Sequence, residues 1–269
     1  MKTREKDIKD IVKSKYNLIA SQSKTQNETS CCGSTGCCDT IEYSVFSDDY
    51  SQIAGYNEDA DLGLGCGLPT EFANISKGDT VLDLGSGAGN DCFVARSIVG
   101  ETGKVIGLDF APNMLKKARE NTAKLGYTNV EFIKGDIEEM PVDDDSVDII
   151  VSNCVLNLVP DKALAFKQMH RILKDDGHFC VSDVVLQGEL PDALIKDAEM
   201  YAGCVAGAIQ KDEYLEIIKN TGFKNVEVKK EKEVIIPDEI LTNYLSDKGL
   251  EEYKSRDLGI YSVTVYADK

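Results

Sequence analysis

Residues 80–89, TVLDLGSGAG, join an apolar run to a glycine-rich turn. The apolar run is typical of a buried strand. Glycines in the turn let the backbone approach a ligand closely and admit positive φ angles. Residues 92–100, CFVARSIVG, then predict a helix whose unpaired N–H groups face that ligand. The order strand, glycine turn, helix predicts a ligand-binding turn in an α/β protein.

Strands and helices continue to alternate after this unit. Helices are expected over 113–126, with Gly126 as its C-cap, and over 161–177, ending at Gly177. Strands separated by helices of this length predict βαβ units and a parallel sheet. The five strands are expected at 80–85, 104–110, 130–136, 146–154 and 178–185.

The region after the fifth strand predicts two helices, over 192–209 and 212–222, and then two strand-like segments. These segments, 225–237 and 261–268, are expected to pair antiparallel at one end of the sheet. At the other terminus, a helix-like start gives way to a polar linker. We therefore divide the chain into an N-terminal helix and Cys-rich arm, 1–40, and one domain, 41–269, whose segment from about 186 to 235 covers the substrate.

Composition limits the classes of function. A net charge of −17 argues against a nucleic-acid partner, because binding phosphates needs a basic surface. No run of 18 apolar residues is present and the N-terminus lacks the apolar stretch of a signal peptide, so we expect no membrane partner and a cytoplasmic location. Nine cysteines in such a chain point to metal, metalloid or redox chemistry rather than to disulfides.

Polar residues follow the first three strands at the edge where open α/β sheets bind ligands. Asp109 ends the second strand, where an acid binds a ribose hydroxyl, and Asp136 follows the third, where a carboxylate can accept from an adenine amine. The turn has G-x-G-x-G spacing and is preceded by Asp83. That carboxylate suits a cationic ligand with an amino-acid part better than a diphosphate.

The motifs DLGSGAG, GLDFAPNML, GDIEEMP and SNCVLNL together resemble the class I S-adenosylmethionine methyltransferases over about residues 79–185. The resemblance implies a Rossmann-like, mostly parallel seven-stranded sheet with helices on both faces and an antiparallel strand at the end. It implies S-adenosylmethionine as the cofactor. The implied cofactor residues are Asp83, Gly85, Ser86 and Gly87 at the methionine side, Asp109 at the ribose, Asp136 and Ile137 at the adenine, and Asn153 near the sulfonium. Phe110, Met114 and Gly135, beside them in the same motifs, are also implied to bind the cofactor.

Three cysteines stand out from those expected in the core, Cys92 and Cys180. Cys154 follows the fourth strand, beside the expected methyl group. Cys66 lies between glycines, which we expect to leave its thiol exposed, and Cys204 lies among small residues in the segment that covers the substrate. Three thiolates form a soft-ligand set that can hold a trivalent pnictogen in a pyramid with its lone pair uncovered. Such an acceptor needs no general base, in keeping with two histidines, His170 and His178, that are poorly placed to act as one.

The motifs LGLGCGLP, SNCVLNL and CVAGA, with the Cys-rich arm, resemble the arsenite S-adenosylmethionine methyltransferases from about Cys31 to the end. The resemblance implies Cys66, Cys154 and Cys204 as the arsenic thiolates. It also implies a fourth catalytic cysteine, Cys38 from the arm, in a disulfide cycle with Cys66. Arsenite or its thiol conjugates would be the substrate, and thioredoxin or glutathione the reductant. Longer relatives carry a further C-terminal domain that this chain is expected to lack.

Alternatives remain at this level. The arm carries Cys31, Cys32, Cys37 and Cys38, and the sequence does not choose among them. Its CC-x4-CC spacing is not the C-x2-C spacing of zinc sites, which favours arsenic capture or thiol exchange over a zinc cluster. A C- or O-methyltransferase of a small organic molecule, such as a quinone precursor, would have no use for Cys66 or Cys204. A non-catalytic metalloid or zinc sensor would bind metal without turnover.

Overall fold

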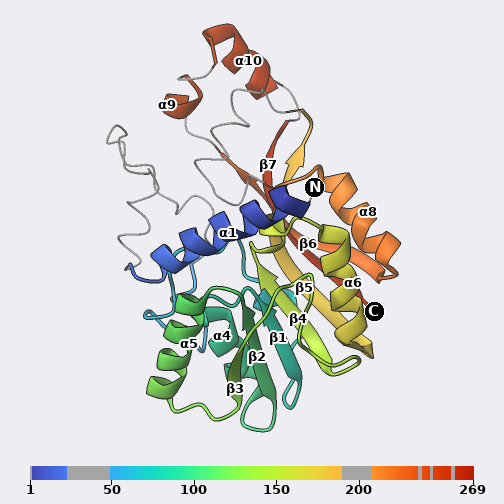
Figure 1. Ribbon diagram of the computed structural model, residues 1–269. Helices are drawn as coiled ribbons and strands as arrows, with labels where there is room; N and C mark the ends of the chain where they lie inside the picture. Colours follow the sequence, from blue (N-terminus) through green and yellow to red (C-terminus); the bar gives the residue numbers. More distant parts are fainter. Residues whose placement is uncertain (1, 23–48, 190–206, 236–237, 243–244, 256–257) are drawn as a thin grey trace.

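The computed structural model describes residues 2–22, 49–189, 207–235, 238–242, 245–255 and 258–269. A seven-stranded sheet with the order β3-β2-β1-β4-β5-β7-β6 organises the chain (Figure 1). The strands are β1 (Thr80–Leu84), β2 (Lys104–Asp109), β3 (Val130–Lys134), β4 (Val147–Asn153), β5 (Leu173–Gln187), β6 (Lys224–Val234) and β7 (Gly259–Asp268).

The first five strands are parallel, as the alternating pattern predicts. β7 runs antiparallel to both β5 and β6, so it lies inside the sheet, between those strands, and β6 forms the edge. The expected antiparallel pairing of the last two strand segments is confirmed. The strand order reverses between β1 and β4, and this switch point is where open α/β sheets bind ligands.

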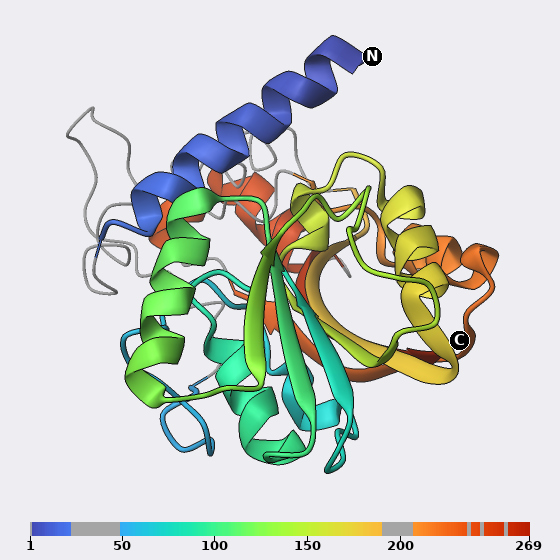
Figure 2. The ribbon, with the colours of Figure 1, turned by 60° about the horizontal axis from the view of Figure 1, so that its bottom comes forward.

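Helices cover both faces of the sheet (Figures 1 and 2). Buried side chains from α4 (Asn90–Val99) and α5 (Pro112–Leu125) form a core on one face, and those from α6 (Lys162–Ile172) and α8 (Lys211–Thr221) form a core on the other. The shorter elements are α3 (Pro69–Phe72), the 3-10 turn η2 (Leu156–Leu158), α9 (Asp238–Leu241) and α10 (Asp247–Ser255).

Local signals set most of the helix ends. Gly126 takes a left-handed conformation, φ 68°, and caps α5 as expected, because glycine pays no steric cost there. The prediction of a helix that ends at Gly177 is wrong. α6 ends at Ile172 and β5 begins at Leu173. Gly177 instead lies where a Cβ would come within 2.9 Å of the Asp148 carbonyl oxygen, so close backbone approach explains this glycine.

The N-terminal helix α1 (Lys2–Ile19) lies across the end of the sheet that carries the strand carboxyl termini (Figure 1). Asn17 fixes it to the start of α5, where its side-chain oxygen accepts from the Asn113 backbone N–H at 3.1 Å. The helix thereby covers the edge of the sheet where a ligand is expected. Among the described residues, no helix combines the length and apolar character needed to cross a membrane.

Candidate functional site

One pocket opens at the carboxyl ends of β1, β2, β3 and β4, at the topological switch point. Its walls contain the whole set of residues predicted to bind the cofactor, and Cys154 beside them. These residues come from four strand ends and the start of α5, so only the folded sheet brings them together. The lining residues predicted from the sequence are Asp83, Gly85, Ser86, Gly87, Asp109, Phe110, Met114, Gly135, Asp136, Ile137 and Asn153.

The glycine turn after β1 lines the pocket and takes left-handed backbone conformations that favour glycine. Gly85 has φ 66°, and a Cβ there would come within 2.3 Å of the Val155 side chain. Gly87 has φ 53°, and its N–H donates to Asp109 Oδ2 at 3.0 Å. Ser86 Oγ is buried and makes no hydrogen bond with the residues that the structure describes. A buried hydroxyl of this kind needs a partner, and a ligand in the pocket can provide it.

Asp109 is held rigidly at the end of β2. Its Oδ1 accepts from the Ala111 N–H at 2.7 Å while its Oδ2 accepts from Gly87. Burial raises the pKa of this carboxyl, and hydrogen bonds from backbone N–H groups oppose that rise. The side chain therefore connects the glycine turn to the start of α5, in the position predicted for a ribose contact.

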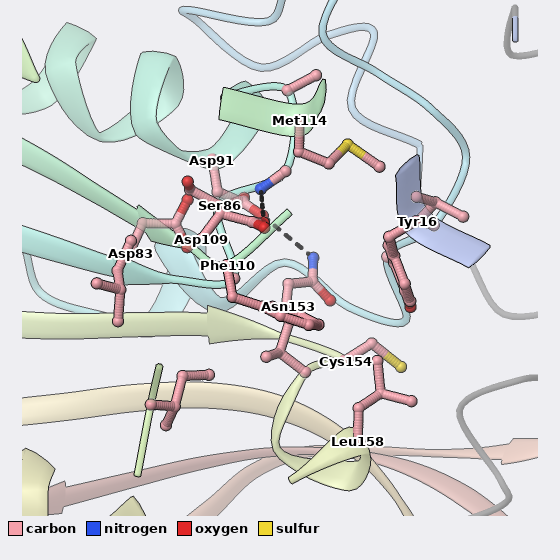
Figure 3. Close-up of a pocket in the computed structure, with 18 of the residues that line it drawn as sticks. Tyr16, Asp83, Ser86, Asp91, Asp109, Phe110, Met114, Asn153, Cys154 and Leu158 are labelled. Carbon is pink, nitrogen blue, oxygen red and sulfur yellow. Dashed lines mark hydrogen bonds between the residues drawn. The ribbon is translucent and has the colours of Figure 1, made fainter. Parts of the chain in front are cut away.

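Acidic side chains gather on one side of the pocket (Figure 3). Asp83 is buried and Asp91 is partly exposed; desolvation is the largest cause that raises the pKa of each carboxyl, and the charge of Asp91 adds to the rise at Asp83. The pKa of Asp91 rises to about 6. Tyr50 donates to Asp91 Oδ1 at 2.8 Å. Desolvated carboxylates favour a cation nearby, so this wall fits the ammonium group of an amino-acid moiety.

Several residues that line the pocket were not among the residues predicted from the sequence. Lys9, Val12 and Tyr16 of α1 line the pocket, and Lys9 forms ion pairs with Asp136, at 2.6 Å, and Glu138. Their spacing of i, i+3 and i+7 places them on one helix face, a signal that the sequence does contain. Figure 3 shows Tyr16 across the pocket from the acidic side chains. For Tyr50 and Asp91, no motif or spacing in the sequence indicates a place in the pocket.

The structure describes four of the nine cysteines. Cys92 and Cys180 are fully buried in the core, as expected. Cys154 lies in the pocket wall directly after Asn153 (Figure 3). The expectation that Cys66 is exposed is wrong, because only 2% of its surface is accessible. Cys31, Cys32, Cys37, Cys38 and Cys204 lie outside the described residues, and within the described part no group of three metal-binding side chains forms.

The two histidines lie away from the pocket lining. His170 packs edge-on against Phe223, with ring centroids 5.2 Å apart, and burial lowers its pKa. His178 Nε2 lies 2.7 Å from the Ala73 carbonyl oxygen. Neither is placed to take a proton from a molecule in the pocket.

Comparison with known proteins identifies the family. Residues 75–222 match the model of a methyltransferase domain. An arsenite methyltransferase of Halobacterium salinarum is 40% identical over 98% of this chain and 67% of its own length. The chain belongs to the arsenite methyltransferase family.

Other members of the family agree with this assignment. The human arsenite methyltransferase is 38% identical over 59% of this chain, and the match spans 44% of the human protein. The crystal structure of an arsenic(III) S-adenosylmethionine methyltransferase from Chlamydomonas reinhardtii superposes with a TM-score of 0.63 and 32% identity, covering 76% of this chain and 67% of that one. The chain thus spans between about half and two thirds of the length of these family members.

Proposed function

We propose that the chain transfers a methyl group from S-adenosylmethionine to trivalent arsenic held by the thiolates of Cys66, Cys154 and Cys204. The reaction class follows from the family: the protein is an S-adenosylmethionine-dependent methyltransferase and acts on arsenite. The observation that supports the thiolate assignment is that Cys154 lies in the pocket wall directly after Asn153, whose side-chain oxygen accepts a hydrogen bond from the Cys66 backbone N–H.

The residues of the pocket fit the cofactor. Asp83 and Asp91 would receive its ammonium group, Asp109 its ribose, and Asp136 with Ile137 its adenine. Buried Ser86 Oγ would gain a partner. S-adenosylmethionine supplies an electrophilic methyl group on a sulfonium. Tyr16 and Val12 of α1, with Met114, would exclude water from this site.

The thiols would orient the substrate. Three thiolates around As(III) leave one lone pair, which can be aimed along the sulfur–methyl bond for an in-line attack. No proton has to be removed from this nucleophile, which agrees with the absence of histidine from the described pocket lining. Catalysis then rests mainly on proximity and orientation.

Methylation of the lone pair formally oxidises arsenic from As(III) to As(V), so a second turnover needs two electrons. We propose that Cys38 and Cys66 supply them by forming a disulfide, which thioredoxin or glutathione then reduces. We also propose that the segment from about 186 to 235 covers the substrate and that the enzyme acts in the cytoplasm.

The test is product formation. The reduced protein is incubated with S-adenosylmethionine, arsenite and glutathione, and methylarsenicals are separated and quantified. Cys66→Ser and Cys154→Ser should each lose about a hundredfold or more in rate, as expected when a group that orients the reacting atom is lost. Cys180→Ser is the matched control, because Cys180 is equally buried but lies inside β5, outside the pocket lining.

The outcomes are distinct. Full activity in both Cys66→Ser and Cys154→Ser would overturn the thiolate site. If wild-type protein makes no methylarsenical but methylates a quinone precursor, the acceptor is organic. Tight arsenic binding without turnover would instead indicate a sensor.

A further inference from the structure

The Asn153 side chain forms two hydrogen bonds with the backbone of Cys66 and Gly67, and we call this pair of bonds the clamp. Its Oδ1 accepts from the Cys66 N–H at 3.0 Å, and its Nδ2 donates to the Gly67 carbonyl oxygen at 2.8 Å. Two hydrogen bonds from one planar carboxamide fix both the position and the direction of a short backbone segment. Asn153 lies 87 residues away from Cys66 in the sequence, so this clamp is a tertiary contact.

Neighbouring side chains hold the carboxamide in place. Asn153 Nδ2 also lies 2.7 Å from the Tyr50 hydroxyl and 3.3 Å from Asp91 Oδ2. Both N–H groups of Asn153 are thereby committed to protein acceptors. Although Asn153 lines the pocket, its N–H groups are directed to Gly67, Tyr50 and Asp91.

The two glycines that flank Cys66 let the clamp close. A Cβ at Gly65 would lie 2.7 Å from Asn153 Nδ2, and a Cβ at Gly67 would lie 2.5 Å from Ser182 Oγ. A side chain at either position would force Asn153 or Ser182 to move. The Ser262 hydroxyl, from β7, donates to the Cys66 carbonyl oxygen on the remaining side. The two glycines therefore allow the Cys66 backbone to pack closely against β4, β5 and β7. This close packing also explains why Cys66 is buried.

The backbone of Cys154 is held by its peptide bond to Asn153 and by a hydrogen bond to Ser182. Cys154 follows Asn153 directly, has a left-handed φ of 60°, and donates its N–H to the Ser182 carbonyl oxygen at 2.8 Å. Both thiols lie close enough to the buried Tyr214 to affect its phenol. Burial is the largest cause that raises the pKa of Tyr214, the Asp183 carboxylate is the next, and charge on Cys66 and Cys154 raises it further. Asn153 thus touches one thiol-bearing residue through its side chain and the other through its peptide bond.

We infer that Asn153 is a positioning residue that sets the placement of the Cys66 thiol relative to the Cys154 thiol, so that one trivalent arsenic atom can bind both. This inference rests on the proposed function, which makes these thiols arsenic ligands. It assigns Asn153 to substrate placement, whereas the sequence assigns it to the cofactor. Tyr50 and Asp91 support it by orienting the carboxamide.

A binding assay without cofactor tests the inference. Phenylarsine oxide condenses with two thiols: two As–S bonds replace the arsenic–oxygen bond, the oxygen leaves as water with both thiol protons, and arsenic stays trivalent. The parent is the reduced full chain carrying Cys31→Ser, Cys32→Ser, Cys37→Ser and Cys38→Ser. Asn153→Leu, which keeps the side-chain shape without hydrogen bonds, should raise the Kd for phenylarsine oxide about tenfold.

Asn129→Leu is the matched control. The Asn129 carboxamide also bridges backbone groups, donating to the Gly100 and Gly103 carbonyl oxygens at 2.8 Å each, but it lies at the opposite end of the sheet. Its Kd should equal that of the parent. Asn153→Asp keeps the acceptor for the Cys66 N–H and loses the donor to Gly67, so its Kd should lie between those of the parent and Asn153→Leu. Urea unfolding of each variant verifies that it is folded.

The possible failures can be told apart. If Cys66→Ser and Cys154→Ser weaken binding but both Asn153 variants bind like the parent, the positioning role is wrong and the thiol site stands. An equal loss in Asn129→Leu overturns the inference as well, because the effect would then be general destabilisation. If neither cysteine variant weakens binding, the proposed thiol site fails and this inference fails with it.

Discussion

Cys154 carries a backbone conformation that few side chains adopt. Its φ of 60° lies in the left-handed region, where a residue with a Cβ is less stable than glycine by about 1 kcal/mol. Strain of this kind persists when the surrounding structure enforces it, here through the hydrogen bond from Cys154 N–H to Ser182. A cysteine at a position that favours glycine is consistent with a chemical task for its thiol.

Comparing two substitutions isolates this strain. Cys154→Gly should have a free energy of unfolding about 1 kcal/mol above that of Cys154→Ala, measured by urea denaturation. At Cys180, inside β5, the order should reverse, because glycine weakens a strand. If Cys154→Ala is as stable as Cys154→Gly, the left-handed conformation stores no strain.

Asp91 should make cofactor binding depend on pH. Burial is the main cause that raises its pKa to about 6. Its charge attracts the ammonium group of S-adenosylmethionine only when the carboxyl is ionised, so lowering the pH from 7 to 5 should weaken binding about tenfold. Isothermal titration calorimetry across this range measures the Kd. Asp91→Asn should bind more weakly at pH 7 with a flatter profile, and an unchanged slope in that variant would assign the titration to another group.

At the scale of elements, α1 belongs to the pocket. Tyr16→Ala should weaken S-adenosylmethionine binding about fivefold to tenfold, because the ring lines the pocket and packs on the α4–α5 core. Leu18→Ala is the control on the same helix, because 60% of Leu18 is exposed. Equal effects of the two substitutions on the Kd would mean that helix stability, and not pocket closure, is responsible.

The sequence predicted regular elements well where local signals exist. The strand–helix alternation, the cap at Gly126 and the antiparallel pairing of the last strands all depend on periodicity or on glycine chemistry. The end of α6 was wrong because Gly177 serves a close backbone contact, which is a tertiary cause. The order of β7 and β6 in the sheet likewise depends on packing and not on local pattern.

The sequence predicts the pocket residues that lie in motifs directly after a strand. Residues at strand ends, such as Asp109 and Cys154, lie together in the pocket wall because parallel strands end at one edge. Tyr50 and Asn153 contribute through partners distant in sequence, so no spacing reveals the clamp on Cys66. The burial of Cys66 was missed for the same reason, since its flanking glycines serve packing and not exposure.

At the scale of the whole molecule, a buried acid links the sheet to the helices of one face. Asp183 of β5 accepts from the Tyr214 hydroxyl of α8 at 3.0 Å, and its Oδ1 has no hydrogen-bond partner among the residues that the structure describes. Burial is the largest cause that raises its pKa to about 7, and the nearby Lys162 ammonium of α6 opposes the rise. The folded protein therefore holds a proton that the unfolded chain, with an aspartate pKa of 3.8, releases.

This proton fixes the sign of the pH dependence of stability. Between about pH 4 and pH 7 the folded state binds more protons than the unfolded state, so the free energy of unfolding falls as the pH rises. For Asp183 alone the loss amounts to about 4 kcal/mol by pH 7, and Asp91, with its pKa of about 6, acts in the same direction. The net charge of −17 adds repulsion as further carboxyls ionise.

Asp183→Asn tests this account, because it keeps an acceptor for Tyr214 and removes the titrating group. Urea denaturation at pH 5, 6, 7 and 8 should show wild-type stability falling from pH 5 to about pH 7 and levelling off by pH 8, while the variant follows a flatter curve and becomes relatively more stable at pH 8. Asp148→Asn is a control with the opposite sign. The Lys174 ion pair, at 2.7 Å, and the Thr80 N–H hold the Asp148 pKa below its usual value of 3.8 despite partial burial, so the stability that Asp148 contributes is complete above about pH 4 and its loss should cost the same at every pH from 5 to 8. A wild-type stability that rises from pH 5 to 8 would rule out a proton held by Asp183.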